Sequence, residues 1–491
     1  MTDAEVDADM ASSSPSLRGR AARGAAWSGA STIVLRLGGL VVGIVIARIL
    51  TPEQFGVYAV ALTVQGILMT VADLGLAADI VRSDEPEKIA PTVATLGLVS
   101  GTALTALTML GSGYLATALG SPDAAPAIAM LSVTLLLGGA GVVPYAFLTR
   151  RFEQRQLFVV GAVDFVVSTV VTLVLIGLGF GVMGLAIGRV AAQTVALGMQ
   201  FLLARVKPHY SIDRTVLRPV LTFGLPIAAA NLLSWGLLNV DNIVLARVAG
   251  AVALGYYVLA FNISSWPMSA LSQMVRSVAL PYFSRAGADT KALSTVTSLA
   301  WAVALPAGAV LAVLSGPVIE VVYGSKWLPA ATVLSALGLY GSLRVVFDIF
   351  TGYLYARGNS RSVLWIQIIW LVTLTGGLIV AVMLYGIIGA GWVHVFVAVA
   401  IILPAYLLVV KRSGVRIGEL LRATCRPTLA TIPVVGAVIV IRLALDDALL
   451  ALLVGGAVAL LLYMALVWPW ARRVFRQVRE GASDPAVGSK G

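Results

Sequence analysis

Charged side chains interrupt the long apolar runs of this sequence. If the runs cross a bilayer, each charged side chain near its middle costs at least ~2.5–3.5 kcal/mol, so such residues usually face a protein interior or a water-filled cavity. The charged residues within the runs are Arg36, Asp73, Asp79, Asp164, Arg189, Asp241, Arg276, Arg344 and Asp348. They are the first candidates for binding a substrate or an ion.

The types of these side chains indicate two kinds of chemistry. An arginine without an acidic neighbour favours an oxyanion such as phosphate, because its planar guanidinium group can bind two oxygens at once. Arg36, Arg276 and Arg344 are the candidates for this role. A carboxylate inside the membrane can instead take a coupling cation or a proton, and Asp73 and Asp241 are the candidates for it.

Amide side chains add polarity to two of the same apolar runs. Asn231, Asn242 and Asn262 lie in the runs that also hold Asp241 and Arg276. Amides both donate and accept hydrogen bonds, so these residues are candidate substrate contacts in a cavity. The lone His394 is predicted to be a hydrogen-bonded packing residue and not a ligand.

A purely structural interpretation of the charges stays open. Arg344 and Asp348 lie four residues apart, so they would share one helix face and could neutralise each other. Arg36 could in the same way pair with Asp73 or with Asp241 and only brace the fold, because structural ion pairs resemble functional sites.

The composition determines what kind of elements position these residues. Of 491 residues 59% are hydrophobic and 12% are charged, against roughly 45–50% and about 25% in soluble domains. A spanning helix needs about 20 mostly apolar residues, and the runs here are too uniformly apolar for the alternating strands of a barrel. The predicted fold class is an all-α polytopic membrane protein.

We predict about 14 transmembrane helices, each of about 20 residues or more. The predicted spans are residues 24–50, 55–81, 92–118, 126–148, 157–178, 182–204, 220–248, 252–282, 293–315, 329–356, 362–384, 387–410, 428–445 and 448–470.

The spans and loops predict a division of the chain. The predicted parts are a disordered cytoplasmic tail (1–23), an N-terminal lobe of six helices (24–204), an amphipathic cytoplasmic connector (205–219), a C-terminal lobe of six helices (220–410), a second amphipathic connector (411–427), a helix pair (428–470) and a cytoplasmic tail (471–491). Both connectors mix aliphatic and basic residues at roughly helical spacing, which predicts short surface helices.

Basic residues predict the orientation in the membrane. Most of the 34 Lys and Arg residues fall in the tails and in alternate loops, which places both termini in the cytoplasm by the positive-inside rule. The net charge of +11 therefore indicates contact with anionic lipid head groups in the bilayer and not with nucleic acid. With one cysteine, Cys425, and two histidines, we expect no disulfide, no Cys/His metal site and no cofactor.

One stretch of the chain occurs twice. Residues 44–61 read IVIARILTPEQFGVYAVA and residues 243–260 read IVLARVAGAVALGYYVLA, which align without a gap. Each copy joins the end of one apolar run to the start of the next through a turn that contains glycine. The repeat predicts two lobes in pseudo-twofold relation, with a cavity between them.

These residues also carry a family resemblance. The stretches ARILTPEQFGVYAVALTVQGILMTVADLGLAADIVR and LNVDNIVLARVAGAVALGYYVLAFNI resemble the first and seventh helix regions of Wzx-type polysaccharide flippases. That superfamily also holds the multidrug and toxin extrusion antiporters and the lipid II flippase. The turn TPEQFG and the segment ADLGL look typical of the polysaccharide branch, and the resemblance extends from about Gly24 to Trp470.

The resemblance implies a function. Flippases of this kind move an undecaprenyl-pyrophosphate-linked oligosaccharide from the inner to the outer leaflet of the bacterial cytoplasmic membrane, by alternating access. They work beside glycosyltransferases and a polysaccharide polymerase of the same pathway. In this chain Arg36, Arg276 and Arg344 would then hold the pyrophosphate.

Two alternatives of the same fold stay open, a lipid II flippase and a cation-coupled multidrug exporter. A membrane enzyme is disfavoured, because the sequence shows no nucleophile, metal or nucleotide motif.

Overall fold

The computed structural model describes the backbone of residues 35–482 except 74, 208 and 286–289. Side chains are described for the same residues except 237–238, 266–267, 269–270, 272–291 and 474–482. The predicted tail at 1–23, residues 483–491 of the second tail and the side chain of Arg276 therefore lie outside the described residues. By contacts between residues the chain forms two compact units, Met1–Val252 and Ala253–Gly491.

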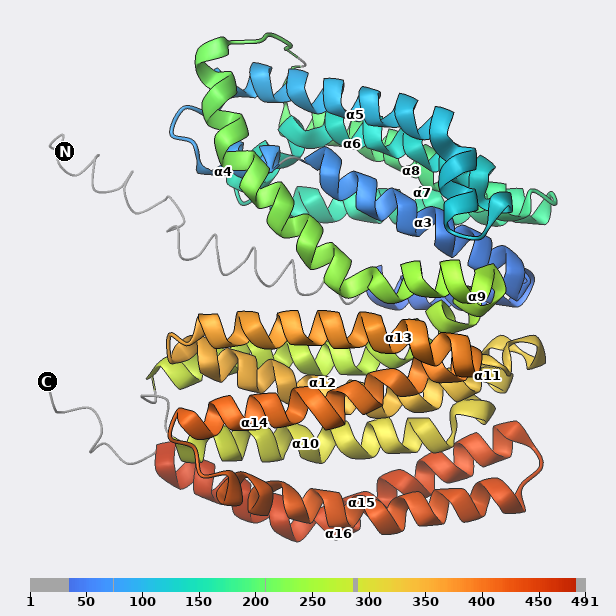
Figure 1. Ribbon diagram of the computed structural model, residues 1–491, viewed down its shortest axis with the longest axis vertical. Coiled ribbons are helices and arrows are strands. Elements are labelled where there is room, and N and C mark those ends of the chain that lie inside the picture. The colour runs from blue at the N-terminus through green and yellow to red at the C-terminus, as the bar shows by residue number, and fades with distance from the viewer. Residues whose placement is uncertain (1–34, 74, 208, 286–289, 483–491) are drawn as a thin grey trace, which may run out of the picture. The chain divides into compact units, whose positions relative to one another are not determined.

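The first unit consists of helices that pack along their length. In Figure 1, α5, α6 and α8 run side by side, and α6 also contacts α3 and α4. Its elements are the helix of residues 35–49, α3 (Pro52–Asp73), α4 (Leu76–Arg82), α5 (Pro86–Ala118), η1 (Pro122–Ala124), α6 (Ala125–Arg150), α7 (Gln154–Gly177), α8 (Gly181–Ala204) and the first part of α9 (Arg214–Arg285).

The second unit is also helical. Here α10 packs against α12 and α15, and α15 forms a hairpin with α16 (Figure 1). Its elements are the rest of α9, α10 (Thr290–Val313), α11 (Ser315–Tyr323), η2 (Ser325–Trp327), α12 (Ala330–Ala356), α13 (Ser360–Val397), the π-helical turn η3 (Ala398–Ile402), α14 (Leu403–Arg412), α15 (Ile417–Ala444) and α16 (Ala448–Ala482).

The all-α membrane fold is confirmed. Twelve helical stretches among the described residues are long and apolar enough to cross a membrane, and the described part contains no strand. Large apolar side chains such as Leu110 and Leu443 are 88% and 80% exposed, as a lipid-facing surface requires.

Two glycines divide long helical stretches where the sequence predicts a turn between spans. Gly386 has φ 58° inside α13, between the predicted spans 362–384 and 387–410. Gly250 has φ 81° inside α9, between the predicted spans 220–248 and 252–282. Both backbones are left-handed, a conformation that only glycine adopts without strain, so these residues end one span and begin the next.

The predicted span 55–81 lies within one candidate span, residues 52–82, but its helix is interrupted. It is broken into α3 and α4 at Gly75, whose φ of 67° lies in the left-handed region. A Cβ on Gly75 would lie 2.9 Å from the carbonyl oxygen of Gly224 on α9, so the turn also depends on a close backbone approach. An apolar pattern does not reveal such a break, because the residues on both sides of it are equally hydrophobic.

The connectors differ from the expected separate helices. Residues 209–213 are not helical: the Asp213 amide donates to Thr92 Oγ1 at 3.1 Å, and the Ser211 carbonyl accepts from Thr95 Oγ1 at 3.0 Å. Helix formation begins only at Arg214, because these contacts to α5 take up the polar groups of the segment. Residues 417–427 are helical but are continuous with α15.

His394 is the packing residue that the sequence predicts. Its ring is buried on α13, and Nδ1 lies 2.8 Å from the Ala390 carbonyl oxygen, which can only accept. Nε2 is then the acceptor for the Tyr257 hydroxyl at 3.3 Å. Both ring nitrogens are therefore satisfied within the second unit.

Candidate functional site

A pocket of about 380 Å³ lies within the first unit, between α3, α6 and α9. It brings together two residues that the sequence predicts for a site, Asp73 and Asn231. The lining consists of Met69, Thr70, Ala72, Asp73, Gly138, Gly139, Val142, Asn231 and Trp235. We call this the α3–α6–α9 pocket.

The break after α3 positions the carboxylate. Asp73 is the last residue of α3, and the chain turns away at Gly75. The side chain is partly exposed and lies in the wall of the pocket. The last carbonyl groups of a helix have no partner within the helix and carry a partial negative charge, and the carbonyl of Ala72 accepts from Ser100 Oγ at 3.5 Å.

The opposite wall is a polar face of α9. Trp235 lies four residues after Asn231, and Asn239 and Asn242 continue the same face at helical spacing. The Asn239 side chain donates to the Trp235 carbonyl at 2.9 Å, and the Asn242 side chain donates to Asn239 Oδ1 at 3.4 Å. A line of amides thus runs from the pocket along the helix.

Glycines keep the space for the larger side chains. A Cβ on Gly66 of α3 would lie 2.8 Å from Trp235 Nε1, so the indole lies directly over this glycine. On α6, a Cβ on Gly138 would lie 2.5 Å from Met69 Cε. Because neither position has a side chain, the ring of Trp235 and the chain of Met69 can line the pocket.

The lining of the α3–α6–α9 pocket is suited to a sugar. An indole ring offers an apolar face, while the carboxylate of Asp73 and the amide of Asn231 can accept and donate hydrogen bonds to hydroxyl groups. Among the described residues, neither lysine nor arginine lines this pocket. A phosphate would therefore have no basic partner in it.

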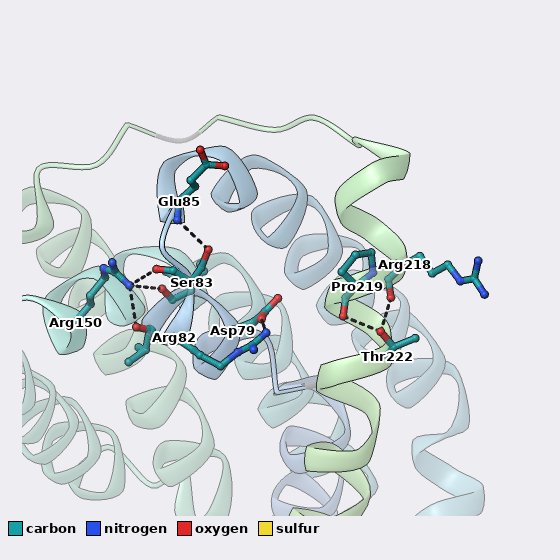
Figure 2. A network of polar contacts seen from close by, with 10 residues as sticks. Asp79, Arg82, Ser83, Glu85, Arg150, Arg218, Pro219 and Thr222 are labelled. Carbon is teal, nitrogen blue, oxygen red and sulfur yellow. Dashed lines mark hydrogen bonds and ion pairs between the residues drawn. The ribbon is translucent and has the colours of Figure 1, made fainter.

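Three charged side chains near one end of the first unit form a local structural network, shown in Figure 2. Asp79 is only 5% exposed and accepts from Arg82 at 3.0 Å, while the Arg82 guanidinium lies 4.0 Å from the centroid of the Phe223 ring. Arg150 of α6 donates to the carbonyl of Val81 at 2.9 Å and caps the end of α4. These groups anchor α4 and do not line the pocket.

Arg189 and Asp164 neutralise each other. The guanidinium of Arg189 on α8 donates to Asp164 Oδ2 on α7 at 3.0 Å. The pair links two helices that pack closely, so both charges have a structural role. The sequence gives no indication of this pair, because the residues lie on different helices.

The other predicted residues of the first unit lie outside the pocket. Arg36 is exposed on the helix of residues 35–49, and neither Asp73 nor Asp241 is its ion-pair partner in the described part. Asp241 is 5% exposed, and its Oδ1 accepts from the backbone N–H of Asn242 at 2.9 Å. The alternative that Arg36 braces the fold through either aspartate is therefore wrong.

Three predicted residues belong to the second unit. Asn262 is exposed on α9, and Arg276 follows on the same helix. Arg344 is half-buried on α12 and forms no ion pair with Asp348, although both side chains are described. The cavity between the two lobes stays a prediction.

The comparisons with known proteins identify the family. A family described as polysaccharide biosynthesis protein matches residues 45–332, more than half of the chain. The chain belongs to this family.

Relatives of this polysaccharide biosynthesis protein are similar over most of their length. The succinoglycan biosynthesis transport protein ExoT of Rhizobium meliloti is 26% identical over 89% of this chain and 90% of its own. The lipopolysaccharide biosynthesis protein WzxC of Escherichia coli is 27% identical over 70% and 71%. The teichuronic acid biosynthesis protein TuaB of Bacillus subtilis is 22% identical over 78% and 81%.

Solved structures share the fold. The inward closed lipid II flippase MurJ matches with a TM-score of 0.75 and 16% identity, over 91% of this chain and 99% of that chain. An inward-facing multidrug resistance transporter of the MATE family matches with a TM-score of 0.61 and 17% identity, over 77% and 94%. The predicted family is confirmed, and this polysaccharide biosynthesis protein shares the predicted two-lobed helical fold of these transporters.

Several residues of the pocket were not predicted from the sequence. Met69, Thr70, Gly138 and Trp235 line the pocket but carry no charge, so a search for charges inside apolar runs does not find them. The spacing of Trp235 four residues after Asn231 is the one feature that indicates its place on the same helix face.

Proposed function

We propose that this protein moves a lipid-linked oligosaccharide across the bacterial cytoplasmic membrane, and that the α3–α6–α9 pocket contacts a sugar during transport. The observation that supports the proposal is the combination of Trp235, Asp73 and Asn231 in one pocket of about 380 Å³. An aromatic face with hydrogen-bonding groups at its edge is chemistry that binds a sugar ring and its hydroxyl groups.

The lipid carrier is proposed to be undecaprenyl pyrophosphate. Its phosphates need basic partners, and Arg36, Arg276 and Arg344 are proposed for this role, since guanidinium groups bind phosphate oxygens in pairs. The sugar and the pyrophosphate would therefore bind to different side chains: the sugar to the α3–α6–α9 pocket and the pyrophosphate to the arginines. A membrane potential that is negative inside supplies ~2.3 kcal/mol per charge per 100 mV, which favours outward movement of the anionic carrier.

The proposed topology follows from the basic loops. Both termini would lie in the cytoplasm, and the substrate would move from the inner to the outer leaflet by alternating access. Glycosyltransferases would supply the substrate, and a polysaccharide polymerase would use it on the outer side.

The test is transport in a strain that lacks the gene. The deletion strain is expected to trap lipid-linked oligosaccharide in the cytoplasmic leaflet and to lose surface polysaccharide, and the wild-type gene restores both. Normal surface polysaccharide in the deletion strain would overturn the proposal.

Single substitutions test the pocket itself. Asp73→Asn and Trp235→Ala are each expected to reduce the rate of surface export by roughly ten- to hundredfold, as the loss of a hydrogen bond to a charged group or of an aromatic contact predicts. Asp123→Asn in η1 and Trp365→Ala on α13 are matched controls, because both side chains are exposed and lie outside the pocket. Membrane levels of each variant show whether it folds.

One observation favours a second candidate function. The pocket has a carboxylate and an indole but no basic side chain among the described residues of its lining, which also suits an organic cation. A cation-coupled exporter would make the deletion strain sensitive to cationic drugs, and Asp73→Asn would share that sensitivity. Unchanged drug sensitivity in both strains would exclude this alternative.

A further inference from the structure

A second pocket of the first unit has the opposite charge. It has a volume of about 360 Å³ and lies where α6 and α8 end and α5 begins. Its lining consists of Glu87, Ala90, Pro91, Ala94, Ala140, Val143, Phe147, Arg151, Phe201, Arg205, Val206, Lys207, His209 and Tyr210. It shares no lining residue with the α3–α6–α9 pocket, and we call it the basic pocket.

The basic pocket is amphipathic. Small and apolar side chains of α5, α6 and α8 form one part of its lining, for example Ala94, Val143 and Phe201. Basic side chains from the ends of α6 and α8 form the other part. The volume falls within the range of about 300–1,000 Å³ that is usual for binding pockets.

The basic side chains differ in what they already bind. Arg151 donates to the Ala204 carbonyl at 2.8 Å and lies 5.2 Å from the centroid of the Phe147 ring, so it caps α8. Within the described part of the chain, the side chains of Arg205, Lys207 and His209 form no hydrogen bond or ion pair. Glu87 is the acidic residue of the lining. The guanidinium and ammonium donors of Arg205 and Lys207 therefore have capacity for an external anion.

Arg205 also has a strained backbone conformation. Its φ of 53° and ψ of 35° lie in the left-handed region, at the C-terminal cap of α8 where glycine or asparagine is usual. A bulky residue in this conformation is strained, and such strain is found at functional sites. Glycine at this position would end the helix without that cost but would remove the guanidinium from the pocket.

We propose that the basic pocket binds an anionic phospholipid from the surrounding bilayer. Arg205 and Lys207 contact the phosphate of the head group, and the start of an acyl chain lies against Ala94, Val143 and Phe201. A soluble phosphate would not need the apolar lining. The neighbouring Leu202 on α8 is 75% exposed, as expected where the helix faces lipid.

Such a lipid would have a structural consequence. It would join the ends of three helices, α5, α6 and α8, at the height of the head groups. Basic pockets between helices at a membrane surface bind anionic lipid head groups in this way. The proposal does not depend on what the transporter carries.

The test is lipid binding by the purified full-length protein. Native mass spectrometry after addition of phosphatidylglycerol should show retained lipid, whereas phosphatidylcholine should dissociate. The variant Arg205→Gln with Lys207→Gln should bind phosphatidylglycerol roughly ten- to hundredfold more weakly, because it loses two charge-assisted hydrogen bonds. Equal retention of both lipids, or unchanged binding by this variant, overturns the proposal.

Two control experiments test the specificity of lipid binding. Arg422→Gln with Arg426→Gln removes the same charge from exposed positions of α15 and should leave binding unchanged; an equal loss here overturns the proposal. Inorganic phosphate at millimolar concentration should not displace the lipid; displacement would identify a soluble anion as the ligand and overturn a lipid site.

Arg205→Gly separates binding from folding. Because glycine fits the left-handed backbone, this variant should unfold at the same temperature as the wild type or higher in phosphatidylcholine, yet lose the rise in that temperature that phosphatidylglycerol gives the wild type. A rise equal to that of the wild type overturns the role of Arg205.

Discussion

The two pockets of the first unit are similar in size and opposite in charge. Both use α6, but from different faces of that helix, so one rigid helix separates two chemically distinct spaces. Gly138, Gly139 and Val142 line the α3–α6–α9 pocket, and Ala140, Val143 and Phe147 line the basic pocket. Uncharged residues of α6 line both pockets, whereas helix ends supply the charge: the end of α3 contributes the carboxylate, and the ends of α6 and α8 contribute the arginines.

The largest expected effect comes from filling one pocket and leaving the other open. Gly138→Leu should push Met69 into the α3–α6–α9 pocket, because even a Cβ there meets Met69 Cε at 2.5 Å. Export of the saccharide should fall more than tenfold, and binding of phosphatidylglycerol should stay unchanged. Gly198→Leu on α8 is the matched control, since a Cβ there meets no atom within 4 Å. Loss of both activities with Gly138→Leu would show that the pockets are not independent.

A smaller effect is expected at the break that ends α3. In Gly75→Ala, the new methyl group would be placed on a left-handed backbone and would lie too close to the Gly224 carbonyl oxygen. The substitution should therefore lower the free energy of unfolding by ~1–3 kcal/mol. Thermal unfolding of the purified protein measures this change. Gly113→Ala, at a helical position with open space, should be neutral or stabilising. If Gly75→Ala is tolerated equally well, the turn is not what positions Asp73.

The paired charges should behave differently from the pocket charges. Asp164→Asn and Arg189→Gln should each destabilise the protein, and the double variant should lose less than the sum, with a coupling of ~0.5–2 kcal/mol. Chemical unfolding of the four proteins of this cycle gives the coupling. Additive losses would mean that the 3.0 Å contact contributes nothing to stability.

The smallest expected effect concerns Asp213. It is the last residue of the non-helical segment 209–213 and directly precedes α9. The Thr215 hydroxyl and amide donate to its carboxylate and lower its pKa below the usual value. A depressed folded-state pKa stabilises the protein above the unfolded pKa of about 3.9 and loses this contribution as the pH falls through the folded value. In the Asp213→Asn variant, the unfolding temperature should therefore fall less than in the wild type when the pH is lowered from about 4 to about 2. Thermal unfolding at a series of pH values measures this difference. An unchanged acid profile would contradict this assignment.

Much of the fold could be predicted from the sequence, because membrane insertion imposes long apolar runs. The turns at Gly250 and Gly386 fall between predicted spans for this reason. The break at Gly75 could not be predicted in the same way. It depends on the approach of Gly224, which lies far along the chain, and on no change of hydropathy.

The candidate site could be predicted only in part. Asp73 and Asn231 stand out because they are polar in apolar runs, and the structure brings them into one pocket. Trp235 is apolar enough to be overlooked, and the pairing of Asp164 with Arg189 depends on how α7 packs on α8. Arg205 resembles any basic loop residue until its backbone conformation is known. In each case the missing information is tertiary.

The break after α3 has a consequence for how this transporter can change over evolution. The acceptors at a helix end belong to the main chain, so no substitution of a side chain removes them. If the pocket binds a sugar as proposed, replacing Asp73 or Asn231 would alter which hydroxyl groups are preferred, whereas the main-chain carbonyl groups would stay as long as the helix ends before Gly75. Under the proposed function, one glycine would therefore keep main-chain acceptors at this place while the neighbouring side chains adapt to new sugars.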